Sequence, residues 1–232
     1  MNKVSIVIPV LNRWDMLIES YKEVIDDDRV DSIVIYDDGS DSAHKANYKT
    51  LESHPKIKLH TGISKSGVHR AKRAAVSNST TDWCVLFDSD NIIEPAYLDT
   101  IFALEPWDEK MVYQPEFLAP HFDFRSMSGL IVDKKNVAEV VNRKNNKLDT
   151  WGNAQNFFVN KSTYLNVWED GHDVNGQDSL YFFYLLMTKG YSMKLTQGLT
   201  YKHRIHEGSN YMSDPRASQK VEDLINKLKQ LR

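Results

Sequence analysis

Hydrophobic residues in the first ninety positions alternate between two patterns. Short, nearly continuous apolar runs are separated by longer segments in which apolar residues recur every three or four positions. The runs are typical of strands buried on both faces of a parallel sheet, and the spaced segments are typical of amphipathic helices. The runs are Val4–Val10, Ile33–Tyr36, Ile57–His60 and Trp83–Phe87. This alternation predicts βαβ units and a parallel sheet.

The second half of the chain is less regular. Its candidate strands are Met111–Gln114, Leu130–Val132, Phe157–Val159 and Met193–Thr200. Its candidate helices are Asn136–Asn142 and Asp178–Thr188, and Gly190 is a plausible stop for the second of these. A last helix is predicted from Pro215 onward, with Asp214 as its cap, because apolar residues there follow helical spacing. Those residues are Val221, Leu224, Ile225 and Leu228.

Composition narrows the class of protein. The chain has 232 residues, which fits one α/β domain, and its formal net charge of -3 argues against a general nucleic-acid binder. Cys84 is the one cysteine, so an intramolecular disulfide is excluded. The sequence has no apolar stretch of the roughly 18 residues that a membrane span needs, and the start of the chain lacks a signal-peptide cleavage pattern. We therefore expect a cytoplasmic protein with no membrane span.

Acidic residues follow two of the predicted strands. Asp37-Asp38-Gly39-Ser40 comes after the second run, and Asp88-Ser89-Asp90-Asn91 comes after the fourth. Ligands of an open parallel sheet bind at the carboxyl ends of its strands, so these carboxylates should gather at one edge. Like charges that crowd together need a cation or hydrogen-bond donors among them, and oxygen ligands on a loop suit Mg²⁺ or Mn²⁺ with substrate phosphates. The alternative for Asp37–Ser40 is a turn followed by a helix cap at Ser40 or Asp41.

These motifs, in this order, resemble the inverting family 2 glycosyltransferases. The resemblance covers nearly the whole chain and implies the nucleotide-diphospho-sugar transferase fold, GT-A: one Rossmann-like domain with a mostly parallel central sheet flanked by helices. The segments that carry it are Val4–Arg13, Asp37–Ser40, Gly67–Ala75, Asp88–Asp90, Gly176–Asp178 and Arg204–Ser209. Within residues 1–232 it implies a nucleotide-binding half (1–92), an acceptor and catalytic-base half (93–212) and a C-terminal helix (213–232).

The resemblance implies a set of nucleotide-binding residues. Asp38 would accept a hydrogen bond from the imide N–H of uridine, or of thymidine. The family's usual arginine before the metal motif is Lys72 here, with Arg70 and Arg73 beside it, which leaves open the residue that reaches the phosphates. The implied set is Pro9, Leu11, Asn12, Arg13, Asp38, Gly67, Arg70, Lys72, Asp88 and Ser89.

The resemblance also implies a metal and a general base. Asp90 would bind Mn²⁺ or Mg²⁺ directly, and Asp88 would touch the ribose or the water shell of the metal. His206 is preferred as a further ligand, with His203 as the alternative, because the two would point to opposite sides of a strand. Asp178 would remove the proton of the acceptor hydroxyl.

Acceptor-binding residues are less well marked. Trp151 could stack on a sugar face while the amide of Asn153 binds hydroxyls, or the same segment is an ordinary loop with a half-buried tryptophan. Gln177 replaces the glutamate that is common in the family. Phe182 and Phe183 belong to an aromatic group that we assign to the core.

The sequence therefore predicts a metal-dependent inverting glycosyltransferase. It would move one hexose from a UDP-sugar to a hydroxyl of a glycan, lipid-linked or protein acceptor; the Gln-x-x-Arg-Trp mark of processive members is missing. Three alternatives remain: a phosphohydrolase of the haloacid dehalogenase type, suggested by Leu86–Asp90; a nucleotidyltransferase on a related fold; and a non-catalytic sugar-binding module. The phosphohydrolase motif fits only approximately and normally lies near the chain start, and the glycine-rich loop of a nucleotidyltransferase is missing after Val10.

Overall fold

The computed structural model describes residues 2–143, 147–152, 156–171, 174, 176–206 and 216–231. Predictions made for Asn153, Asp214 and Pro215, and for the part of the motif at residues 207–209, fall outside these residues. Among the described helices, none has the length and apolar character needed to cross a bilayer.

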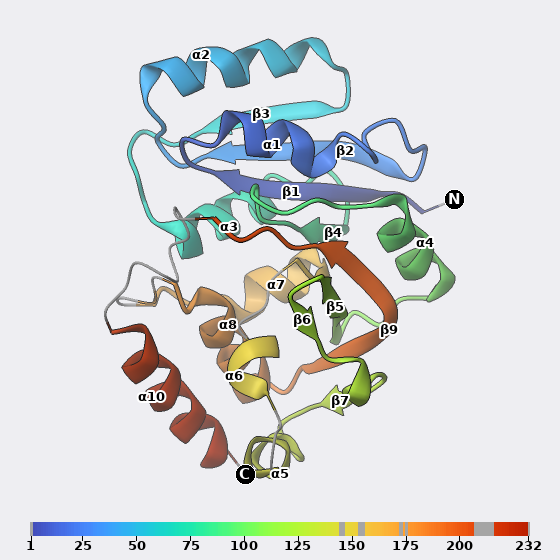
Figure 1. Ribbon diagram of the computed structural model, residues 1–232, viewed down its shortest axis with the longest axis vertical. Helices are drawn as coiled ribbons and strands as arrows, with labels where there is room; N and C mark the ends of the chain where they lie inside the picture. Colours follow the sequence, from blue (N-terminus) through green and yellow to red (C-terminus); the bar gives the residue numbers. More distant parts are fainter. Residues whose placement is uncertain are drawn as a thin grey trace.

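One sheet runs through the described part of the chain (Figure 1). Its strand order is β3-β2-β1-β4-β8-β5-β9-β7, and β6 pairs with β5 beside this path. The strands are β1 (Val4–Val10), β2 (Val30–Asp37), β3 (Ile57–Thr61), β4 (Trp83–Leu86), β5 (Met111–Ala119), β6 (Phe122–Asp123), β7 (Ile131–Val132), β8 (Phe158–Asn160) and β9 (Ser192–Lys202).

Most of the strands point the same way. β3, β2, β1 and β4 are parallel, β8 runs against both β4 and β5, and β9 is parallel to β5. β5 and β9 therefore share the direction of the first four strands, while β6, β7 and β8 are reversed. The expected α/β fold with a mostly parallel central sheet is confirmed.

Helices cover the sheet and close its lower end in Figure 1. α3 packs on β1 and β2, α4 packs on β9, and α10 packs on α5 and α8. The α-helices are α1 (Trp14–Tyr21), α2 (Ser42–Thr50), α3 (Val68–Ser77), α4 (Pro95–Ala103), α5 (Val137–Asn142), α6 (Leu148–Trp151), α7 (Lys161–Val167), α8 (Asp178–Thr188) and α10 (Ala217–Lys229).

The apolar pattern predicted the strands and the packing of the helices. Every residue of β1 is buried, as expected for a strand covered on both faces. Leu224 and Leu228 are buried on α10, so the spacing of that segment gave its inner face correctly. α4, α6, α7 and β6 were not predicted, and α2 was anticipated only through the alternative in which Ser40 or Asp41 caps a helix.

A tight turn links β2 to α2. Gly39 has φ +84°, and a Cβ atom placed there would lie 2.6 Å from the backbone nitrogen of Lys65. The loop after β3 therefore lies directly against this turn, and glycine is needed both for its conformation and for its lack of a side chain.

Candidate active site

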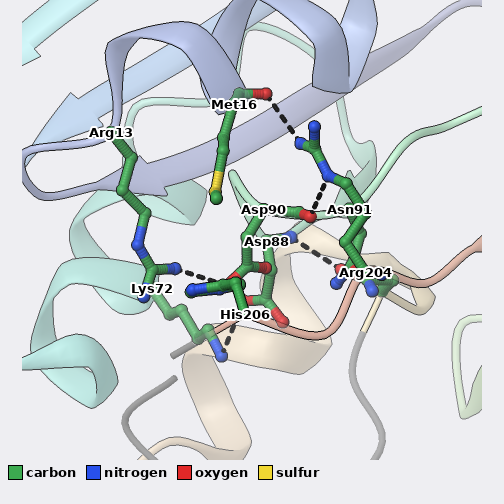
Figure 2. Close-up of polar contacts among 9 residues, drawn as sticks. Arg13, Met16, Lys72, Asp88, Asp90, Asn91, Arg204 and His206 are labelled. Carbon is green, nitrogen blue, oxygen red and sulfur yellow. Dashed lines mark hydrogen bonds and ion pairs between the residues drawn. The ribbon is translucent and has the colours of Figure 1, made fainter. Parts of the chain in front are cut away.

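Charged side chains from four parts of the chain meet at the carboxyl end of the parallel strands (Figure 2). Asp88 and Asp90 follow β4, and Arg13 follows β1. Lys72 comes from α3 and His206 follows β9, and Figure 2 shows both directed at the Asp88–Asp90 loop. The topology brings these residues together because the carboxyl ends of parallel strands share one edge.

Lys72 lies at the centre of the cluster. Its Nζ is 2.8 Å from Oδ2 of Asp178, the first residue of α8, and 3.1 Å from Oδ1 of Asp88. The side chains of Lys72 and Asp178 are 4% and 8% exposed. Burial disfavours the ammonium ion, but Asp178 and Asp88 outweigh that cost, and the pKa of Lys72 is raised. Lys72 is therefore a buried cation held by two carboxylates.

Asp90 has two partners of its own. The guanidinium of Arg13 forms an ion pair with its Oδ2, and Nε2 of His206 lies 2.9 Å from the same oxygen. Burial opposes ionisation of Asp90, yet Arg13 and the His206 hydrogen bond outweigh it, so the pKa of Asp90 is lowered. Asp90 is held as a carboxylate beside an imidazole nitrogen.

Asp88 differs from Asp90 in its electrostatic surroundings. Its pKa is raised, chiefly by burial and also by the neighbouring carboxylates, although Lys72 opposes the shift. Its backbone N–H donates to Oδ1 of Asn156 at 2.6 Å. Asn156 is fully buried, has φ +73° and lies just before β8, so this strand anchors the acidic loop from the side opposite β1.

Arg204 fixes the end of β9 to the same loop, as Figure 2 shows. Its guanidinium donates to the carbonyls of Asp90 and Met16, the latter at 2.9 Å, and pairs with Glu19. Its backbone N–H donates to Oδ1 of Asn91 at 3.1 Å. These contacts bring His206, two residues further on, to Asp90. Sequence reasoning assigned no role to Arg204 or Asn91; their signal was their position inside the two motifs.

Comparisons with known proteins match the chain to one family. The family model described as "Glycosyl transferase family 2" matches residues 5–120, which include β1 to β5 and the Asp88–Asp90 loop. The chain belongs to glycosyl transferase family 2. A search of curated proteins gave no match.

Solved structures share the family 2 fold. A crystal structure of S. aureus TarS 1-349 has 14% identity and a TM-score of 0.70, covering 97% of this chain and 65% of that one. The same fragment in complex with UDP-GlcNAc has 15% identity and a TM-score of 0.72, covering 97% of this chain and 66% of that one. A longer S. aureus TarS structure gives 15% and 0.68, with 96% and 39% covered. The chain thus spans slightly less than two thirds of the TarS fragment and 39% of the longer chain.

In this family 2 chain, Asp38 of the expected nucleotide motif is held by hydrogen bonds from Ser66 and Gly67. Oδ1 of Asp38 accepts from the N–H and hydroxyl of Ser66 at 2.8 and 2.6 Å, and Oδ2 accepts from the N–H of Gly67 at 2.9 Å. Asp38 is 3% exposed. It therefore orders the loop that starts α3 and so positions Lys72 indirectly.

The loop after β1 is tied to the same turn. The N–H of Asn12 donates to Oγ of Ser40 at 2.9 Å, and Asn12 Oδ1 accepts from the N–H of Asp41 at 2.9 Å. Asp41 caps α2 by accepting from His44. The turn-and-cap interpretation of Asp37–Ser40 thus holds alongside the predicted placement at the site edge. Pro9 is the second-last residue of β1, and Leu11 follows the strand with a partly buried side chain. Ser89 is buried between Asp88 and Asp90.

Arg70 does not reach the cluster. It forms a two-pronged ion pair with Asp170 at 2.8 and 3.0 Å, and the side chain of Arg73 lies over the ring of Trp168. Residues two apart on a helix point roughly 200° apart, so Arg70 and Lys72 face opposite sides. Of the three basic residues on α3, Lys72 is the one that contacts Asp88. The expectation for Arg70 needs this correction.

The choice between the two histidines is also resolved in part. Nδ1 of His203 lies 3.0 Å from Nδ1 of His121, and the pKa of His203 is lowered by burial and by that neighbour. His206, by contrast, contacts Asp90. The structure thus pairs His206, and not His203, with the carboxylate of Asp90.

Two acceptor-site expectations do not fit the structure. Trp151 is fully buried and packs edge-on against Phe183 with ring centres 5.3 Å apart, so no ring face is open to a sugar. Gln177 is also fully buried, and its side-chain amide has no hydrogen-bond partner among the residues described here. Trp151 lies in the core because it packs on the buried aromatic residues of α8. Phe182 and Phe183 are buried as expected.

The donor atoms at the sheet edge fit a divalent cation that substrate helps to hold. The described residues contain no group of three or more His, Cys, Asp or Glu side chains arranged to hold a metal. Asp90 and His206 do place a carboxylate oxygen and an imidazole nitrogen 2.9 Å apart at the sheet edge. Two protein ligands suit Mg²⁺ or Mn²⁺ when substrate phosphates supply further oxygens, so the pair fits such a site.

Proposed function

We propose that this chain is a metal-dependent inverting glycosyltransferase that moves one hexose from a UDP-sugar to an acceptor hydroxyl. One observation carries the proposal. Asp178 and Asp88, 90 residues apart, meet on the ammonium of Lys72, while Asp90 of the same loop pairs with His206. The proposed general base, the acidic loop and the two proposed metal ligands therefore lie within one cluster, which supports transfer from a nucleoside diphosphate.

The proposed donor is a uridine nucleotide sugar. TarS, on the same fold, has been crystallised with UDP-GlcNAc and with UDP, which supports a UDP-sugar as the class to test first. Oδ2 of Asp38 accepts one hydrogen bond, from Gly67, and a carboxylate oxygen can accept two. Asp38 can thus accept from the imide N–H of uracil without releasing the loop. Pro9, Leu11 and Arg13 would line the rest of the base and ribose pocket.

The proposed metal site consists of Asp90 and His206. A bound Mn²⁺ or Mg²⁺ would offset the negative charge that develops on the leaving diphosphate. Arg13 keeps Asp90 ionised in its absence, and Arg204 orients His206 from behind. The positive charge of Lys72 supplements that of the metal close to the phosphates.

The proposed base is Asp178. Its oxygen would take the proton of the acceptor hydroxyl while the hydroxyl oxygen bonds to the anomeric carbon and the bond from that carbon to the diphosphate breaks. One base with in-line attack inverts the anomeric configuration. Asp178 is the first residue of α8.

The acceptor remains a class: a hydroxyl of a glycan, a lipid-linked sugar or a protein. Residues 1–92 contribute Arg13, Lys72, Asp88 and Asp90, and residues 93–212 contribute Asp178 and His206. We therefore keep the division into a nucleotide-binding half and an acceptor and catalytic-base half, with 213–232 as a separate helical segment.

The test is calorimetric titration with UDP, with and without Mn²⁺. We expect metal-dependent binding that is lost in Asp90→Ala and kept in Asp28→Ala, which removes an exposed carboxylate of the same type. TDP and GDP replace UDP if UDP fails to bind, and failure of all three would sink the proposal. A release assay on a panel of UDP-hexoses then separates the classes: a transferase releases UDP, a phosphohydrolase releases inorganic phosphate, and a sugar-binding module releases neither.

A further inference from the structure

Lys72 contacts one carboxylate oxygen of the proposed base. Its Nζ donates to Oδ2 of Asp178 at 2.8 Å, and both side chains are almost completely buried. A carboxylate oxygen that already accepts a charge-assisted hydrogen bond is a weaker acceptor for a further proton. Asp178 is therefore a weaker base while Lys72 contacts it.

The same ammonium lies at the donor site. Its second partner is Oδ1 of Asp88, at 3.1 Å, in the loop that also holds Asp90. An ammonium group has three N–H donors on a flexible stem, so it can change partners by rotating about its side-chain bonds. A diphosphate carries more negative charge than a single carboxylate and would compete strongly for it.

The backbone that carries Lys72 is fixed. α3 is attached to the segment before α8 through Arg70 and Asp170, through the stacked rings of His69 and Trp168, and through Nε2 of His69, which lies 2.8 Å from the carbonyl oxygen of Glu169. Because α3 also packs on β1 and β2, the helix cannot shift easily. A change of partner at Lys72 therefore involves its side chain and leaves α3 in place.

We infer that Lys72 couples the two substrates: its contact weakens Asp178 as a base until the diphosphate of the donor draws the ammonium away. This inference rests on the proposed function. It makes donor binding a precondition for activating the acceptor. Lys72 is a positioning residue in this role, since it acts on the acceptor through Asp178.

The coupling predicts an unusual effect on donor affinity. Removing the carboxylate of Asp178 releases Lys72 for the phosphates, so Asp178→Asn should bind UDP·Mn²⁺ more tightly than the unmodified chain, by about tenfold. Loss of a nearby negative charge contributes to that gain without Lys72. The same substitution is therefore made in a Lys72→Met background, where we expect a gain of about threefold or less.

Two further variants complete the calorimetric cycle. Lys72→Arg keeps the positive charge, so in that background Asp178→Asn should retain most of its effect on UDP affinity. Lys49→Met removes an exposed lysine on α2 and should leave UDP affinity and the effect of Asp178→Asn unchanged. If Lys72→Met does not fold, Asp178→Asn and a crystal structure of the unmodified chain with UDP and Mn²⁺ carry the test.

The outcomes separate the inference from the proposed function. A crystal structure in which Lys72 Nζ contacts a phosphate oxygen and no longer contacts Asp178, together with a non-additive cycle, supports the coupling. Equal gains in both backgrounds, no gain in Asp178→Asn, or a Lys72–Asp178 contact that persists with UDP bound would overturn it while leaving the glycosyltransferase proposal standing. Failure of UDP, TDP and GDP to bind the unmodified chain removes the proposed function and the inference with it.

Discussion

Asp38 holds the start of α3 in place through Gly67. Its Oδ2 accepts from the N–H of Gly67 at 2.9 Å, and Oδ1 accepts from Ser66 twice. The two residues are 29 positions apart, and the contact joins the turn after β2 to the helix that carries Lys72. Asp38 therefore has a structural task besides the one proposed in nucleotide binding.

Replacing Asp38 by asparagine should lower both the stability of the fold and the affinity for UDP. The amide of Asp38→Asn would turn an NH₂ group toward one of the N–H donors, and we expect a loss of about 1–3 kcal/mol in the free energy of unfolding. UDP affinity should fall as well. Urea denaturation and calorimetry measure the two effects, with Asp28→Asn as an exposed control. Unchanged stability would contradict the structural role of the contact.

Gly39 and Gly190 provide a matched pair of substitutions. Both have positive φ, but a Cβ added at Gly39 would lie 2.6 Å from the backbone nitrogen of Lys65. A Cβ added at Gly190 would have no atom of the described residues within 4 Å, apart from its chain neighbours. We expect Gly190→Ala to cost about 1 kcal/mol from backbone strain alone, and Gly39→Ala to cost about 2 kcal/mol or more. The measurement is the urea midpoint of each variant. Equal losses would mean that the loop after β3 yields without cost.

Arg204 should control the metal site from outside it. Lysine cannot reproduce the contacts of the guanidinium with Asp90, Met16 and Glu19, so in Arg204→Lys the end of β9 should loosen and His206 should lose its position. We expect the Mn²⁺ concentration needed for half-maximal UDP binding to rise by about tenfold or more. Lys202→Met, on the same strand, is the control. An unchanged Mn²⁺ requirement would argue against the role assigned to Arg204.

The two histidines near the end of β9 should behave differently. His206→Ala removes an imidazole that contacts Asp90, while His203→Ala removes one that contacts His121. Mn²⁺-dependent UDP binding should drop in the first variant, by about tenfold or more, and remain in the second. Mn²⁺ electron paramagnetic resonance with UDP present reports the bound ion directly. The reverse result would make His203 the ligand.

His69 should give the fold a pH dependence. It is 6% exposed, and burial lowers its pKa below the ordinary value of 6.5 despite its contact with the carbonyl of Glu169. The unfolded chain then binds a proton more readily than the folded one, so this contribution to stability is complete above pH 6.5 and is lost as the pH falls toward the folded pKa. Urea midpoints measured from neutral to mildly acid pH should fall less steeply toward acid in His69→Gln. Identical slopes would exclude His69 as the cause.

The fold could be predicted from sequence where one pattern dominates. β1 and α8 were predicted with their observed boundaries, because a run rich in β-branched residues and a glycine after the helix leave little choice. β2 and β9 were predicted too short, since each continues past its apolar run through polar residues such as Ser32, Asp37 and Lys202 that pair with neighbouring strands. The reversed direction of β8 depends on contacts with β4 and β5 and has no local signature.

Some residues of the site could also be predicted from the sequence, and others could not. Asp88 and Asp90 could be placed because they follow a buried strand, and their shared edge with Arg13 follows from parallel topology. The partner of Lys72 could not be predicted, since Asp178 lies 106 residues away on another element. Trp151 was expected either to stack on a sugar or to be half-buried in a loop, whereas it is fully buried against Phe183 of α8.

The reversed strand β8 changes where function should be sought in the sequence. Its first residues lie beside the last residues of β4, so the polar residue that serves the site, Asn156, comes before the strand instead of after it. A search for chemistry that scans only the segments following apolar runs will pass over such positions. In a sheet that contains an antiparallel strand, the residue before that strand lies at the same edge as the residues that follow its parallel neighbours. Substituting that residue can therefore change the conformation of an acidic loop while every acidic side chain is kept.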